Sequence, residues 1–165
     1  MTAGSPMSAL MARVAGGLFQ EAFVVDDFEG AQRALISTLG CGPFVTLPAT
    51  DLEYDFRGGR ISCALEIGFA RSGNMQIELL RPVRGAGLHS EFLESNGPGA
   101  HHLGFLVDDL DEEVREAKAL GYASVQGATF GALRFCYLDT YADLGLYVEL
   151  VEDPTAMMMT LMPWR

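Results

Sequence analysis

Short apolar segments alternate with amphipathic, helix-like segments along the chain, and the same succession occurs twice. The sequence Gln20-Glu-Ala-Phe-Val-Val-Asp-Asp27 returns as His102-Leu-Gly-Phe-Leu-Val-Asp-Asp109. A second sequence, Met75-Gln-Ile-Glu-Leu-Leu80, returns as Leu146-Tyr-Val-Glu-Leu-Val151. Because internal repetition is the signature of a duplicated structural unit, the chain is predicted to contain two copies of one unit.

Each copy is predicted to fold as one strand, one helix and three further strands. Apolar, β-prone runs bounded by Gly and Asn indicate strands, and a run that begins after Asp and ends at Leu-Gly indicates a capped helix. In the first copy the strands are predicted at 18–25, 52–56, 61–70 and 74–80, and the helix at 28–39. In the second copy the strands are predicted at 101–107, 123–130, 133–138 and 146–151, and the helix at 110–120.

These elements predict an α+β fold made of two tandem βαβββ modules. The segment between the modules is rich in Gly and Pro, and is predicted to be a linker with a short helix near residues 89–94. The predicted parts are an N-terminal arm at 1–16, a first module at 17–80, a linker at 81–100, a second module at 101–153 and a C-terminal tail at 154–165. The Met-rich tail is apolar enough to cover a partner subunit or to close over a cleft, so a homodimer is expected.

Four polar side chains interrupt the apolar strands at corresponding places in the two copies: Gln20, Glu78, His102 and Glu149. Two of them are carboxylates, which are costly to bury without a partner. One imidazole, two carboxylates and one amide oxygen form a ligand set suited to Zn, Ni, Co, Mn or Fe. Taken singly, each of the four is more simply a solvated edge position or a satisfied core group. Their coincidence in both copies favours a shared metal.

Strand alternation predicts which neighbours share a face with these four side chains. It directs Phe19, Phe23 and Val25 toward the packed helix, on the opposite face from the predicted ligands. It also places His101 opposite to the predicted ligands, where packing or hydrogen bonding is its expected role. His89, in the linker, is expected at the surface.

The charge balance narrows the classes of partner. The chain has 22 acidic and 11 basic side chains and a formal net charge of −11, so nucleic acid is not expected to bind. No apolar run approaches the length of about 20 residues that spans a bilayer, and the N-terminus lacks the pattern of a signal peptide. The sequence therefore predicts a cytoplasmic protein that acts on a small molecule.

Two segments carry a resemblance to a known family. The segment Phe92-Leu-Glu-Ser-Asn-Gly-Pro-Gly-Ala-His-His-Leu-Gly-Phe-Leu-Val-Asp-Asp109 and the segment Ile77-Glu-Leu-Leu-Arg-Pro82 look like those of methylmalonyl-CoA epimerases. Over residues 17–153 the chain resembles the vicinal oxygen chelate superfamily, which also includes glyoxalase I, extradiol dioxygenases and the fosfomycin and bleomycin resistance proteins. The four predicted ligands are similar instead to the set of zinc-type glyoxalase I. The resemblance implies that the modules curl into an incomplete barrel around a metal cleft.

The resemblance and the residues together imply a chemistry. A divalent metal (Zn, Ni, Co or Mn, with Fe less favoured) would assist proton transfer next to a carbonyl, with Glu149 and Glu78 as the catalytic groups. The expected activity is an isomerisation, epimerisation or lyase reaction on a small oxygenated compound or its thioester. Substrate contacts are predicted at Gln76, Tyr147, Phe135 and Arg60. Two alternatives stay open: a ring-cleaving dioxygenase, and a metal-free protein that binds or sequesters a small molecule.

Overall fold

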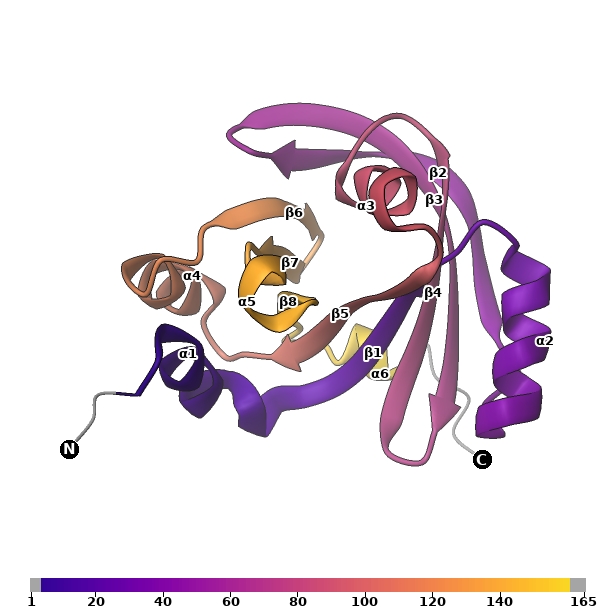
Figure 1. The fold of residues 1–165 in the computed structure, drawn as a ribbon, viewed down its shortest axis with the longest axis horizontal. Helices are drawn as coiled ribbons and strands as arrows, with labels where there is room; N and C mark the ends of the chain where they lie inside the picture. Colours follow the sequence, from indigo (N-terminus) through magenta and orange to yellow (C-terminus); the bar gives the residue numbers. More distant parts are fainter. Residues whose placement is uncertain (1–3, 161–165) are drawn as a thin grey trace.

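The computed structural model describes residues 4–160, which form a single closed barrel of eight strands with helices around it (Figure 1). The strands are β1 (Leu18–Val24), β2 (Val45–Phe56), β3 (Gly59–Ser72), β4 (Met75–Arg84), β5 (Gly99–Leu106), β6 (Ser124–Phe130), β7 (Leu133–Leu138) and β8 (Tyr147–Glu152). The helices are α1 (Pro6–Val14), a 3-10 turn (Ala15–Gly17), α2 (Phe28–Leu39), α3 (Leu88–Asn96), α4 (Leu110–Ala119), α5 (Tyr141–Leu144) and α6 (Met157–Thr160).

The strand order around the barrel is β1-β4-β3-β2-β6-β7-β8-β5. Strands β1 and β4 pair in parallel, as do β5 and β8, and β1 pairs antiparallel with β5 at the junction of the two halves. The other junction is short, because β2 and β6 pair only at Asp55–Gly127 and Phe56–Gln126. The expectation of an incomplete barrel is therefore wrong: this second junction closes the ring of strands. The origin of the halves as tandem modules stays a prediction.

Helices cover opposite sides of the barrel. Helix α2 packs on the outside of the first half, where Phe28 joins Val25 and Leu79. On the other side, α1 and α4 lie together against the second half (Figure 1). The predicted N-terminal arm is thus a packed element, because Leu10 and Val14 of α1 are buried with the core of the second half.

Helix α2 has the bounds that the sequence predicts. Asp27 caps its first turn by accepting a hydrogen bond from the Gly30 amide, and Gly40 ends it at a φ of 62°, which a side chain would disfavour. Strand β2, in contrast, begins earlier than predicted. Its first half is exposed and contains Pro48 beside an irregularity in pairing, so no apolar alternation marks it.

The strands at the main junction carry one bulge each. Phe19 is an extra residue in β1 between the pairs Leu18–Phe105 and Gln20–Gly104, and His101 is an extra residue in β5 between the pairs that flank it. A bulge turns the extra side chain toward the face of its neighbour. Phe19 consequently packs with Phe69 and Val151 inside the barrel. Strict alternation predicts that Phe19 faces α2, and this prediction is wrong. Phe23 and Val25 do face α2, as predicted.

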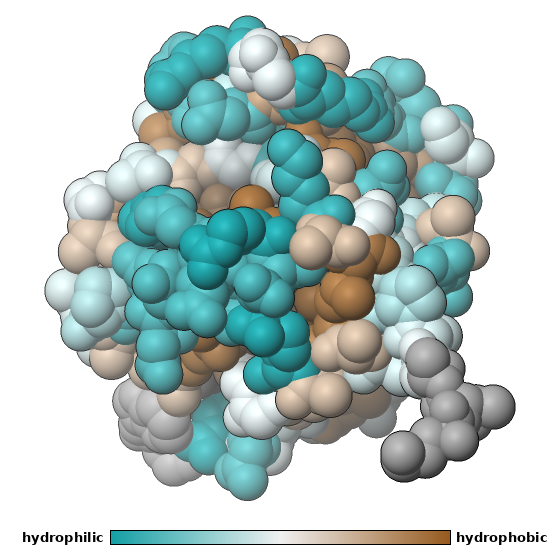
Figure 2. Space-filling model, turned by 90° about the vertical axis from the view of Figure 1, so that its left-hand side faces the viewer, coloured by the Kyte–Doolittle hydropathy of each residue, from teal (hydrophilic) through white to brown (hydrophobic). Residues whose placement is uncertain are grey.

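The outer face over α1 and α4 is mostly hydrophilic (Figure 2). Helix α4 contributes the acidic residues of its first turn, Asp111, Glu112 and Glu113, and two side-chain hydrogen bonds from Arg13 to Glu113, at 2.8 and 3.0 Å, fasten α1 to it. None of the helices in the described part of the chain is long and apolar enough to cross a membrane.

Candidate metal centre

The imidazole of His102 faces three oxygen atoms from three other strands. Its Nε2 lies 3.2 Å from Gln20 Oε1, 3.2 Å from Glu78 Oε2 and 3.4 Å from Glu149 Oε2. These side chains come from β1, β4 and β8, while His102 is on β5, and all four are buried. The four residues predicted as ligands are therefore brought together from both halves of the chain.

The distances from His102 Nε2 to the three oxygens are those of neighbouring ligands around one cation. Metal–ligand bonds of about 2.0–2.2 Å, at angles of about 90–110°, place neighbouring ligand atoms about 2.8–3.6 Å apart. A proton on His102 would satisfy these oxygens less well than a metal ion. Nε2 of a protonated His102 carries one N–H, whereas it faces three acceptor oxygens. A divalent cation accepts a nitrogen and several oxygens as ligands, so the chemistry of these four side chains fits a cation better than a proton.

Strand register explains how Glu78 reaches His102. Glu78 of β4 is paired with Ala22 of β1, and Ala22 is paired on its other side with His102 of β5. All three side chains point into the barrel, and the small methyl group of Ala22 leaves space between the carboxylate and the imidazole. The two ligands therefore meet across the middle strand of a three-strand row.

A parallel row brings Gln20 and Glu149 together. Gln20 of β1 pairs with Gly104 of β5, which pairs in turn with Glu149 of β8. A Cβ at Gly104 would lie 2.7 Å from Gln20 Oε1 and 3.0 Å from Gln20 Cβ, so a side chain there would displace the amide. Gln20 is also held from behind, because its Nε2 donates a hydrogen bond of 2.6 Å to Gln76 Oε1. The amide oxygen is thereby directed at His102.

Burial sets the electrostatics of the centre. Burial raises the pKa of the Glu78 carboxyl, and the nearby His102 offsets this only in part. Burial alone would lower the pKa of His102, but the carboxylates of Glu149 and Glu78 outweigh it and raise the pKa to about 9. Burial, aided by the Glu149 carboxylate, also raises the pKa of the Tyr137 phenol well above its ordinary value. The two glutamates therefore create a strong local preference for positive charge.

Two further histidines lie behind His102, and both were predicted elsewhere. His101 Nδ1 is 2.9 Å from His102 Nδ1, because the bulge turns His101 inward; its predicted place on the opposite face is wrong. His89 of α3 stacks on His101 with ring centroids 4.7 Å apart and is 2% exposed, so its predicted surface position is also wrong. One ring nitrogen of each of the three histidines lies within 4.8 Å of the others. The stacked rings of His89 and His101 direct their in-plane lone pairs side by side, which disfavours chelation between them.

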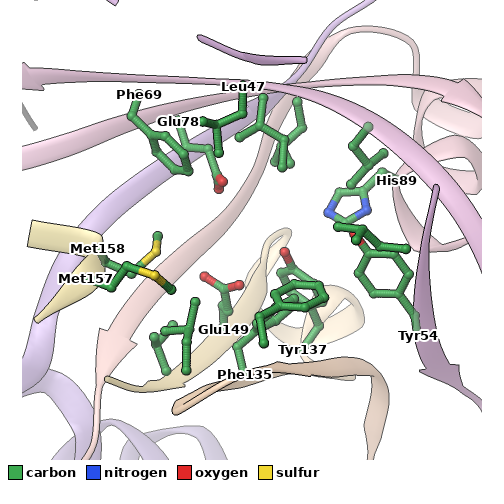
Figure 3. A pocket seen from close by; sticks show the side chains of 17 residues that line it. Leu47, Tyr54, Phe69, Glu78, His89, Phe135, Tyr137, Glu149, Met157 and Met158 are labelled. Atoms are coloured by element: carbon green, nitrogen blue, oxygen red, sulfur yellow. The ribbon is translucent and has the colours of Figure 1, made fainter. Parts of the chain in front are cut away.

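A cavity of about 260 Å³ opens beside the centre (Figure 3). Figure 3 shows the Glu78 and Glu149 side chains reaching toward each other from opposite sides of it, with His89 at one end and Met157 and Met158 at the other. The two methionines belong to the predicted tail, whose helix α6 is tied down by a 3.0 Å hydrogen bond from Gln76 Nε2 to the Met158 carbonyl. The remainder of the tail, 161–165, lies outside the described residues, so the expected homodimer stays a prediction.

Of the four residues predicted to contact substrate, one lines the cavity and three lie elsewhere. Phe135 lines the cavity. Gln76 and Tyr147 do not line it: Gln76 supports Gln20, and Tyr147 packs against His101 at 5.0 Å. Arg60 also lies away from the cavity, exposed at the start of β3 and paired with Asp55 at 3.3 Å.

Sequence reasoning did not identify His89 as part of the site. It lies in the loop-rich segment between the repeats, and only the packing of α3 against β4, β5 and β1 brings it inside. The adjacent histidines at 101 and 102 held a signal, since a bulge at that point would direct both rings inward.

The comparisons with known proteins agree with this architecture. A methylmalonyl-CoA epimerase from Mycobacterium tuberculosis superposes with a TM-score of 0.57 at 24% identity, covering 96% of this chain and 97% of that one. Hypothetical protein BH1468 from Bacillus halodurans C-125 gives 0.60 at 21% identity, covering 82% and 93%. A variant of 4-hydroxymandelate synthase from Streptomyces coelicolor gives 0.58 at 19% identity, covering 82% of this chain and 48% of that one.

These structural likenesses concern the fold, and a search of curated protein sequences found no match. The family model described as "Glyoxalase/Bleomycin resistance protein/Dioxygenase superfamily" matches residues 19–137, which include the first strand, the first ligand pair and the His102 strand. The chain therefore belongs to the glyoxalase/bleomycin resistance protein/dioxygenase superfamily, the vicinal oxygen chelate superfamily that its repeated sequence resembles.

Proposed function

We propose that this chain is a divalent-metal-dependent enzyme that moves a proton on a small oxygenated substrate, in an epimerisation or isomerisation. The observation that carries the proposal is the convergence of three oxygens within 3.2–3.4 Å of one buried imidazole nitrogen. Gln20, Glu78, His102 and Glu149 would hold the metal. Bound there, a divalent cation would act as a Lewis acid toward a carbonyl oxygen and acidify the neighbouring C–H bond.

The two glutamates supply the proton-transfer groups. Glu149 and Glu78 approach the cavity from opposite sides, so one can accept a proton from one face of a carbon and the other can return it to the opposite face (Figure 3). Burial raises the pKa of the Glu78 carboxyl above its ordinary value, which favours the protonated form that a proton donor needs. We assign proton abstraction to Glu149 and proton return to Glu78.

The histidine pair supports this chemistry by fixing a tautomer. If His102 Nε2 ligates a cation, that nitrogen carries no proton, and the Nδ1–H then donates to His101 Nδ1 at 2.9 Å. His101 is therefore a positioning residue. It orients the His102 ring and increases its basicity as a ligand.

The test combines metal content with proton exchange. Protein stripped by chelator and reloaded with Zn²⁺, Ni²⁺, Co²⁺ or Mn²⁺ is expected to retain about one equivalent by elemental analysis. In deuterated water, the loaded protein should exchange the C–H proton beside the carbonyl of an acyl-CoA thioester, a glutathione hemithioacetal or an uncharged hydroxyketone, followed by proton NMR. Glu149→Gln should slow this exchange about 10²–10⁴-fold. Failure to retain any divalent metal would overturn the proposal.

The apolar cavity favours one second candidate, a metal-free protein that binds a hydrophobic molecule. In that case a protonated His102 would pair with the two glutamates without a metal ion, which its pKa of about 9 permits. Ligand binding that is unaffected by chelator, without proton exchange, would favour this candidate over the enzyme.

A further inference from the structure

No cationic side chain from residues 4–160 lines the cavity. Within residues 4–160, the only charged lining residues are Glu78 and Glu149, and the other polar ones are His89, Tyr54 and Tyr137. The remaining walls are aliphatic and aromatic side chains together with the thioethers of Met157 and Met158. An anionic group placed in this cavity would meet two carboxylates and no cationic side chain from the described residues. The walls therefore select an uncharged, hydrophobic molecular body.

His89 is the exception in these walls, because no other residue of the described range 4–160 uses its hydrogen-bonding atoms. The residue is 2% exposed, and both of its ring nitrogens are buried without a hydrogen-bond partner in that range. Its ring is held by the stack on His101 and by an edge contact with Tyr137, at a centroid distance of 5.2 Å. Buried polar groups without partners carry a free-energy penalty, and native proteins keep few of them. Because His89 lines the cavity, a polar ligand group at that end would lie against its ring.

The charge state of His89 suits recognition of a neutral group. Burial lowers the pKa of His89 to about 3, so the ring is uncharged at neutral pH. A neutral imidazole offers one N–H donor and one nitrogen acceptor, which matches a hydroxyl or a carbonyl group. His89 belongs to α3 and not to the four strands that carry Gln20, Glu78, His102 and Glu149.

We infer that the site takes an uncharged, hydrophobic carbonyl compound with a second polar group, a hydroxyl or carbonyl, that hydrogen-bonds to His89. This inference rests on the proposed function for the carbonyl that meets the metal. His89 is then a specificity-determining residue. A site built around such a contact discriminates against an analogue that lacks the group, because the imidazole is again left unpaired.

Three probes of the same shape test the inference: 1-phenylbutan-1-one, 4-hydroxy-1-phenylbutan-1-one and 4-oxo-4-phenylbutanoate, which end in a methyl, a hydroxymethyl and a carboxylate group. Their dissociation constants are measured by calorimetry on the metal-loaded protein. The hydroxyl compound should bind about tenfold more tightly than the methyl compound, the size of one net hydrogen bond. The carboxylate compound should bind more weakly than both. Equal or tighter binding of the carboxylate compound would overturn the inference.

Two variants assign the preference to His89. His89→Phe keeps a flat ring for the stack and removes both nitrogens, so the tenfold preference for the hydroxyl compound should disappear. His89→Gln should restore part of it. An unchanged preference in His89→Phe would overturn the role of His89. Thermal unfolding and metal content are recorded for each variant. If the wild type retains no metal, the proposed function fails, but the probe preference measured in that protein still decides the role of His89.

Discussion

The two halves of the barrel share one backbone feature, a bulge in the first strand of each, but carry different side chains at it. Each first strand places a bulge directly before a predicted ligand: Phe19 before Gln20 in β1, and His101 before His102 in β5. In the first half the bulged ring is hydrophobic and joins Phe69 and neighbouring apolar side chains. In the second half it is an imidazole in contact with His102. The repeated backbone therefore determines where the bulged side chain points. The residue type at that one position determines whether its surroundings in each half are apolar or polar.

The next inward position differs in the same way. Ala22 of β1 and Gly104 of β5 lie between ligands in corresponding rows, but only Gly104 lies so close to Gln20 that a Cβ would collide with it. The asymmetry of the centre thus depends on a small number of positions. Exchanging residues between the halves tests each of them.

The largest effect is expected from making the ligands alike. His102→Gln gives both halves an amide, and metal affinity should fall more than about hundredfold because the imidazole ligand is lost. The metal-free variant should also lose about 3–5 kcal/mol of stability, since Glu78 and Glu149 remain buried without their partner. Calorimetric metal titration and denaturant unfolding measure the two effects. As the matched control, Gln20→His introduces an imidazole and should retain metal; loss of metal in both variants alike would contradict the assigned roles.

Making the bulges alike should have the next largest effect. His101→Phe gives both halves an aromatic ring and removes the acceptor for His102 Nδ1, so metal affinity should fall about 10–100-fold. As a control at the corresponding bulge of the first half, Phe19→Leu should leave metal affinity unchanged. It should lower the free energy of unfolding by about 1 kcal/mol. Equal metal affinity in His101→Phe and the wild type would show that His101 does not orient the ligand.

Burial of the neutral His89 ring should make the free energy of unfolding fall at acidic pH. The pKa of His89 is about 3 in the folded chain, below the value of about 6.5 expected for the unfolded chain. As pH falls below about 6.5 the unfolded chain binds this proton first, so stability present at neutral pH is lost progressively toward pH 3. Between pH 7 and pH 5, His89 should account for a loss of about 2 kcal/mol. Denaturant unfolding of His89→Phe should show a correspondingly smaller loss than the wild type; identical losses would be contrary to burial of a neutral His89.

The smallest effect is expected from making the spacer positions alike. Gly104→Ala gives both halves a methyl group, which would press against Gln20 and move its oxygen away from His102. Metal affinity should fall about tenfold, the size of one weakened contact. Ala22→Gly, the reverse exchange, should retain full metal affinity. A Gly104→Ala variant that binds metal as tightly as the wild type would contradict the close approach.

The convergence of Gln20, Glu78, His102 and Glu149 could be predicted because strand alternation holds along most of β4 and β8. Strand alternation could not predict the neighbours of the centre, since a bulge cancels alternation at Phe19 and at His101. His89 depended on a long-range packing event of α3, and the exposed start of β2 lacked an apolar face to read. Helix α2 was predicted to the residue because its ends are set by local groups, the Asp27 cap and Gly40.

The central claim is that one cation joins the two halves through Gln20, Glu78, His102 and Glu149. Anomalous diffraction from a crystal of the zinc-loaded protein tests it most directly. The account predicts a single strong peak in the barrel, about 2.0–2.2 Å from His102 Nε2 and from oxygens of the other three side chains. A barrel without such a peak, or a zinc ion bound by other residues, would contradict the claim.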